Sequence, residues 1–181
     1  MEITTKRTLT VLLVLAWIIF VGICIEAGGF IVNAFFALVN PSVVKHLWHE
    51  ADLSALLVYN TWYFFAAMLL MSVVAILKAW LFYLIIKILH DKNFNLAQPF
   101  NGVLRRFIFN IACITFMIGL FSWWGVKYTS WLTGQGVAIP DIQDLRLGGA
   151  DVWLFMSVTL FVIGQIFKRG VEMQAENELT I

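Results

Sequence analysis

Long runs of apolar residues, separated by short polar segments, dominate the pattern along this chain. A helix that crosses the roughly 30 Å hydrocarbon core of a bilayer needs about 20 mostly apolar residues. Four runs satisfy this requirement, at about residues 9–30, 56–77, 107–126 and 150–167. We expect helices in all four, because a helix satisfies its own backbone hydrogen bonds in lipid. The pattern predicts one all-α domain: a polytopic membrane protein with four transmembrane helices in a bundle.

The segments between these runs predict the connections and the tail. Connections at about residues 40–54 and 127–150 are expected on one side of the membrane, and a connection at residues 90–106 on the other. Residues 168–181 are expected to form a tail on the same side of the membrane as the connection at residues 90–106. The first two apolar runs are longer than one membrane thickness, so we expect their helices to continue beyond the hydrocarbon.

The distribution of basic residues predicts how the chain is oriented. Eight of them flank the first run, the connection at residues 90–106 or the end of the last run: Lys6, Arg7, Lys87, Lys92, Arg105, Arg106, Lys168 and Arg169. Only three fall in the other two connections: Lys45, Lys127 and Arg146. Loops on the cytoplasmic side of a membrane carry an excess of Lys and Arg. Both termini and the middle connection are therefore expected in the cytoplasm.

Composition agrees with a lipid environment and argues against one class of function. The chain is 61% hydrophobic and 13% charged, whereas soluble domains carry about a quarter charged residues. Its net charge of +1 argues against direct nucleic-acid binding, because such proteins cluster cations against phosphates. The two cysteines, Cys24 and Cys113, are expected at different depths of the membrane and therefore as free thiols.

Polar residues inside the apolar runs are the first candidates for a site. Glu26 and Lys78 lie furthest inside, and a charge in a membrane span normally faces other helices, a water cavity or an opposite charge. Counted from their flanks, the two residues differ in depth by about 10 Å, which argues against a direct pair. A direct pair, separate snorkelling to the nearer interface and a proton or ion relay all stay open. Asn110 and Gln165 are expected to form hydrogen bonds between helices.

The sequence gives little support for a metal site or a catalytic site. His46 and His49, at a spacing of three, are weak candidates for metal ligands, because no third ligand is evident and the spacing is not that of a zinc-binding His-Glu-x-x-His helix. The sequence contains no Cys-x-x-Cys pair, no phosphate-binding glycine loop and no recognisable acid–base set. We therefore expect no catalytic residue, no cofactor and no enzymatic activity.

Two segments resemble a known family. These are the stretch Gln98-Pro99-Phe100 that leads to Arg105-Arg106, and the ending from Phe167 to Ile181. Both are similar to the YoaS-like family of bacterial four-helix membrane proteins, a domain of unknown function. The resemblance implies a location in the bacterial inner membrane. It also implies a partner, since members are often encoded beside a small Cro/C1-type helix-turn-helix regulator.

The tail is the candidate surface for such a partner. Basic residues at its start would lie at anionic headgroups, and the glutamates that follow could mask a basic DNA-reading helix. The candidate partner-binding residues are Lys168, Arg169, Glu172, Glu176 and Glu178. The sequence thus favours a membrane-bound regulator or sequestering partner of a transcription regulator, with oligomers possible. The alternative is a small transporter or channel component with a polar path near Glu26 and Lys78.

Overall fold

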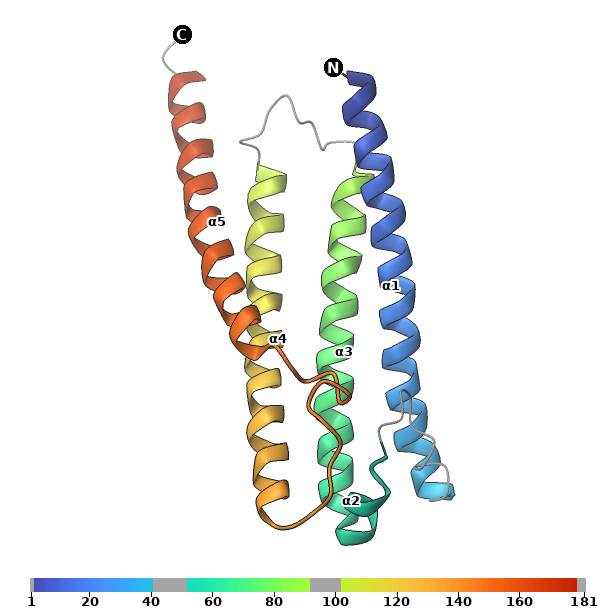
Figure 1. Cartoon of the computed structure of the whole chain (residues 1–181). Coiled ribbons are helices and arrows are strands. Elements are labelled where there is room, and N and C mark those ends of the chain that lie inside the picture. Colours follow the sequence, from blue (N-terminus) through green and yellow to red (C-terminus); the bar gives the residue numbers. More distant parts are fainter. Residues whose placement is uncertain (1, 41–51, 92–101, 179–181) are drawn as a thin grey trace.

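The structure is a computed structural model that describes residues 2–40, 52–91 and 102–178. Its elements are α1 (Glu2–Val39), α2 (Ser54–Tyr59), α3 (Thr61–His90), α4 (Gly102–Gly134) and α5 (Ala150–Glu178) (Figure 1). Within these ranges the chain forms helices and no strand, so the prediction of an all-α protein is confirmed.

Each of the four long helices contains a segment that is long and apolar enough to cross a membrane. The segments are Arg7–Val39, Thr61–His90, Gly102–Gly134 and Ala150–Gln174. Large apolar side chains cover much of their outer surface, as on Ile18 of α1 and Phe155 of α5, which are 64% and 74% exposed. Such a surface is favourable against hydrocarbon and unfavourable against water. The predicted number and type of long helices are therefore confirmed.

The helices form a row in the order α1, α3, α4, α5, and neighbours in this row pack against each other (Figure 1). Neighbouring helices run in opposite directions. We call the end where α1 and α4 begin and α3 and α5 end the termini end, and the opposite end the α2 end. Helices α1 and α5 each have a single long helical neighbour, which explains why so many of their apolar side chains are exposed.

The start of α3 differs from the sequence prediction. The predicted second span begins near residue 56, but Leu56 belongs to the separate helix α2, and α3 begins at Thr61. Asn60 separates the two helices, because its side-chain oxygen accepts hydrogen bonds from the backbone N–H groups of Trp62 at 2.8 Å and Tyr63 at 3.4 Å. This is the N-cap arrangement, which satisfies donors that the first helical turn leaves unpaired.

Small residues on α4 bring α5 unusually close. A Cβ atom added at Gly119 would lie 2.8 Å from the side chain of Leu154 and 3.0 Å from its backbone nitrogen. Ala112, Thr115 and Ser122 lie near Gly119 at helical spacings and are buried. Small residues let backbones approach in a membrane, where no hydrophobic effect drives helices together. The contact also fixes the register, with the first turns of α5 opposite the middle of α4.

Candidate functional site: an ionic cluster beside the α4–α5 connection

The connection between α4 and α5 runs back into the molecule. Because Leu154 lies opposite Gly119, the chain must return from Gly134 at the α2 end to the middle of α4 (Figure 1). Residues 135–149 make this return, and Val137, Leu145 and Leu147 along it are buried in the main apolar core. The predicted loop at residues 127–150 is thus shorter, since α4 continues to Gly134, and its buried apolar side chains anchor it to the core.

Two turns of the same kind shape this connection. The N–H groups of Gly136 and Val137 donate to the carbonyls of Thr133 and Leu132, at 2.9 and 3.3 Å. The pair of hydrogen bonds is the Schellman motif, which needs a residue in the left-handed conformation, and Gly136 supplies it with φ of 81°. Glycine adopts this conformation at no steric penalty.

The second turn places an arginine where the first has a glycine. The N–H groups of Arg146 and Leu147 donate to the carbonyls of Gln143 and Ile142, at 3.0 and 3.2 Å. Arg146 therefore occupies the left-handed position, with φ of 57°. That conformation costs a residue with a Cβ atom about 1–2 kcal/mol. A non-glycine residue held there indicates that its side chain makes contacts that offset the strain.

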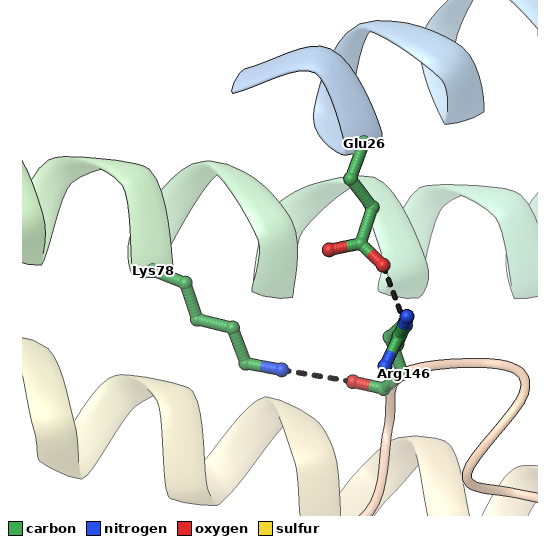
Figure 2. Close-up of polar contacts among 3 residues, drawn as sticks. All are labelled: Glu26, Lys78 and Arg146. Carbon is green, nitrogen blue, oxygen red and sulfur yellow. Dashed lines mark hydrogen bonds and ion pairs between the residues drawn. The ribbon is translucent and has the colours of Figure 1, made fainter. Parts of the chain in front are cut away.

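The side chain of Arg146 meets Glu26 of α1. The arginine Nε lies 2.6 Å from the Oε1 atom of Glu26, whose side chain is only 18% exposed (Figure 2). Oε1 is buried and accepts no well-aligned hydrogen bond within the described residues, so the contact is an ion pair rather than an aligned hydrogen bond. A buried carboxylate without a cation would be unstable in this setting. Arg146 thus compensates the charge of Glu26.

The backbone of the same residue meets Lys78 of α3. The Lys78 ammonium donates a hydrogen bond to the Arg146 carbonyl at 3.0 Å (Figure 2). It also lies 6.0 Å from the centre of the Trp153 ring of α5. Helical side chains lean toward the N-terminus of their helix, which for α3 is the α2 end. Lys78 therefore reaches toward the connection. We call Glu26, Lys78 and Arg146 the ionic cluster.

The predicted depth mismatch between Glu26 and Lys78 is wrong. Phe20 and Tyr83 are in contact, with ring centroids 6.5 Å apart. From that level, six residues along α1 lead to Glu26, and five residues along α3 lead to Lys78, so both lie at nearly the same level. The prediction placed the start of α1 and the end of α3 at equal depth, whereas α1 extends further at the termini end (Figure 1). The two residues share Arg146 as a contact instead of forming the direct pair or snorkelling apart.

The other predicted polar residues do not join this cluster. Asn110 of α4 is exposed and lines a cavity at the termini end, and Gln165 is exposed on α5. His46 and His49 lie outside the described residues. Within residues 2–40, 52–91 and 102–178, no group of three His, Cys, Asp or Glu side chains is arranged to hold a metal ion.

The candidate partner-binding residues lie on the last turns of α5. Glu172 forms ion pairs along its own helix, at 4.0 Å with Lys168 and 3.7 Å with Arg169. Glu176 is exposed, and Glu178 is the last residue of the helix. Pairs of this kind on an exposed helix contribute about 0.3–0.5 kcal/mol each. The described part of the tail, residues 168–178, is thus a helical surface whose charges can exchange partners at small free-energy cost.

Arg146 is the functional residue that sequence reasoning missed. Its position in a polar connection marked it only as one of three basic residues on that side of the membrane. The pattern Ile142-Gln143-Asp144-Leu145-Arg146-Leu147 shows no glycine to signal a left-handed turn. The signal that could have been used is the charge imbalance, because Glu26 has no basic residue nearby in sequence. Comparison with protein-family models, curated proteins and solved structures finds no match to this chain.

The cluster is suited to holding elements together rather than to chemistry. One residue of the connection contacts two helices, through its side chain on α1 and its backbone on α3. Two cations and one carboxylate leave a net charge of +1, and Arg146 is nearly half exposed, at 47%. The arrangement can open when water, an ion or a ligand competes for either charge, and it resists opening while the connection stays packed.

Proposed function

We propose that this chain is a multi-pass protein of a bacterial inner membrane that restrains a small cytoplasmic helix-turn-helix transcription regulator. Release follows when the contacts of the connection 135–149 change. The observation that carries the proposal is the ionic cluster, in which a strained Arg146 links α1 and α3 to the segment that leads into α5. A strained residue held by releasable contacts is a common feature of switch regions.

In the proposed orientation, the two ends of the switch lie on different sides of the membrane. The excess of Lys and Arg near the termini end supports a cytoplasmic location for that end. The four long helices then cross the bilayer together as a bundle, and the ionic cluster lies toward the outer face. In this orientation the connection 135–149 receives the stimulus and the tail faces the regulator.

Helix α5 is the proposed transmission element. It begins directly after the connection and continues as one helix from Ala150 to Glu178. It packs extensively only against α4, so a shift of α5 disturbs a single helix interface. A change in the connection therefore moves the tail, because a continuous helix transmits displacement along its axis. Such coupling requires an element with two discrete arrangements, and we propose that these are the packed and the released connection.

The acidic surface of the tail supports binding of a basic partner. Glu172 and Glu176 are one helical turn apart and lie on the same face. The DNA-reading surfaces of helix-turn-helix proteins are rich in Lys and Arg. The weak pairs of Glu172 with Lys168 and Arg169 can be replaced by pairs with these residues of the regulator.

The test is co-purification of the chain, extracted in detergent, with the helix-turn-helix regulator encoded beside it. We expect Glu172→Gln/Glu176→Gln, and deletion of residues 172–181, to abolish co-purification without loss of membrane insertion. The control is Asp151→Asn, which removes a carboxylate from the opposite end of the same helix. Undiminished binding after the deletion would refute the role of the tail.

A second experiment tests the switch. Glu26→Gln removes the charge that holds Arg146, so we expect the regulator to dissociate faster than from the unmodified protein. The matched control is Lys127→Gln, because Lys127 lies over the Trp123 ring at 5.9 Å from its centre and takes no part in the cluster. Equal dissociation rates for Glu26→Gln and the unmodified protein would contradict the proposed coupling.

A transporter or channel component is the second candidate, because three charges lie between the helices. Between the cluster and the termini end, however, buried apolar side chains including Ile114, Ile118 and Leu81 fill the interior. Such packing gives ions no hydrated route in this state. Ion flux through proteoliposomes that is lost in Glu26→Gln would favour transport over regulation.

A further inference from the structure

A cavity of about 390 Å³ lies between α3 and α4 at the termini end. Its polar lining comes from Lys87 of α3, from Asp91 directly after α3, and from Arg106 and Asn110 of α4. The ammonium of Lys87 and the guanidinium of Arg106 have no hydrogen-bond or ion-pair partner in the described part of the chain. Two cations and one carboxylate give this lining a net charge of +1.

The depth of the cavity follows from its apolar wall. Ile88 and Phe107 line it, and they also line an adjoining cavity of about 430 Å³ whose lining residues, from α1, α3 and α4, are all apolar. These two residues therefore lie at the level of hydrocarbon. Lys87 and Arg106 are each adjacent in sequence to one of them, so their backbones lie within one helical rise, about 1.5 Å, of that level. Their long side chains can extend to the edge of the hydrocarbon, where lipid phosphates are found.

We propose that this cavity binds the phosphodiester headgroup of an anionic glycerophospholipid. Lys87 and Arg106 bind the phosphate oxygens, and Arg can do so with two parallel hydrogen bonds. Asn110 offers an amide one helical turn deeper, and the wall of Ile88 and Phe107 accommodates the start of an acyl chain. Basic pockets between transmembrane helices at the cytoplasmic side are suited to anionic headgroups.

The charge of the lining favours an anionic lipid over a zwitterionic one. A phosphatidylglycerol headgroup carries one negative charge, which neutralises the net charge of +1. A phosphatidylcholine headgroup has the same phosphate but adds a cation, which leaves the lining charge uncompensated. The proposal rests on the crossing of the bilayer by α3 and α4 and is independent of any regulator.

The test is native mass spectrometry of the purified full chain in detergent, titrated with phosphatidylglycerol or phosphatidylcholine. We expect Lys87→Gln/Arg106→Gln to weaken phosphatidylglycerol binding about thirtyfold, since each cation near anionic lipid contributes roughly a fivefold effect. The matched control is Arg105→Gln/Lys168→Gln, which removes the same charge from residues outside the cavity lining, and we expect a change below threefold.

A single substitution keeps the test valid if the double variant misfolds. Lys87 is exposed, so Lys87→Gln is expected to keep the helical circular dichroism signal and to weaken phosphatidylglycerol binding about fivefold. Equal weakening by the cavity and control variants would overturn the proposal, because it would indicate general attraction to a basic surface. Equal affinity for phosphatidylcholine would overturn it as well. Because no regulator is present, these outcomes are separate from those that test regulator binding.

Discussion

Arg146 makes two opposing contributions to stability: its ion pair with Glu26 stabilises the fold, and its left-handed backbone destabilises it. Two replacements of Arg146 separate these contributions. Arg146→Ala removes the ion pair with Glu26 and keeps a Cβ atom in the left-handed position. Arg146→Gly removes the same ion pair and also relieves the backbone. The two variants therefore differ in left-handed strain and in the freedom of the unfolded chain. Comparison of Arg146→Ala with the unmodified protein gives the contribution of the ion pair.

The structure sets the magnitude of each contribution. Exposed pairs contribute about 0.2–1 kcal/mol, and loss of a partner from a fully buried pair costs about 3–5 kcal/mol. Arg146 is 47% exposed and Glu26 is 18% exposed, so we expect about 1–2 kcal/mol for loss of the arginine side chain. Glycine recovers about 1–2 kcal/mol of left-handed strain but loses about 0.5–1 kcal/mol through the greater freedom of the unfolded chain. Arg146→Gly should therefore be about half as destabilising as Arg146→Ala.

The assay is unfolding in mixed micelles with increasing denaturing detergent, followed by helical circular dichroism. Gly136→Ala calibrates the left-handed penalty in the same protein, because φ at Gly136 is 81° and an added Cβ atom would meet nothing within 4 Å. Identical stability of the Arg146→Ala and Arg146→Gly variants would mean that the left-handed strain is no larger than the loss of about 0.5–1 kcal/mol that glycine causes through the unfolded chain, which is below the expected strain. If both variants match the unmodified protein, the ion pair contributes nothing and the reasoning fails.

Three further substitutions test the packing around the cluster. Gly119→Ala should destabilise the α4–α5 interface by about 1–3 kcal/mol, because the new methyl group meets the backbone nitrogen of Leu154 as well as its side chain. Gly125→Ala should be milder, because the nearest atoms to the new methyl group all belong to the side chain of Leu147. Equal unfolding free energies of the two variants would contradict this order. Ser122→Ala should be neutral or stabilising by up to about 1 kcal/mol, since the buried hydroxyl has no hydrogen-bond partner within the described residues, and a clear loss of stability would reveal one. Asn60→Ala should lower the unfolding free energy by about 1 kcal/mol, whereas Asn60→Asp should retain it, because aspartate also caps helices. Unchanged stability of the alanine variant would argue against an N-cap at Asn60.

The parts of the fold that follow from local pattern could be predicted from the sequence. Four long apolar helices were expected because span length and helix formation depend on composition over about 20 residues. The break at Asn60 was missed because the apolar run continues across it, although Asn is a preferred N-cap residue. The charges at Glu26 and Lys78 were recognised as unusual, but their common level depends on how far α1 extends beyond α3, and that register comes from packing.

The path of the connection 135–149 back to the middle of α4 could not be predicted either, because it also depends on packing. It depends on where α5 begins opposite α4, which the close contact of Gly119 with Leu154 determines. Only after that register is known does Arg146 come within reach of α1 and α3. Its left-handed conformation is also invisible in the sequence, because the usual marker of such a turn is glycine, as at Gly136.

The separation of the cluster residues along the chain imposes an order on biosynthesis. Lys78 and Arg146 are 68 residues apart, and Glu26 is further still from the arginine that compensates it. The ribosome therefore completes α1 and α3 well before it reaches Arg146. Until the connection is made and folds back, Glu26 lacks the arginine that compensates its charge. A chain that stops before residue 146 therefore contains the carboxylate without its compensating cation.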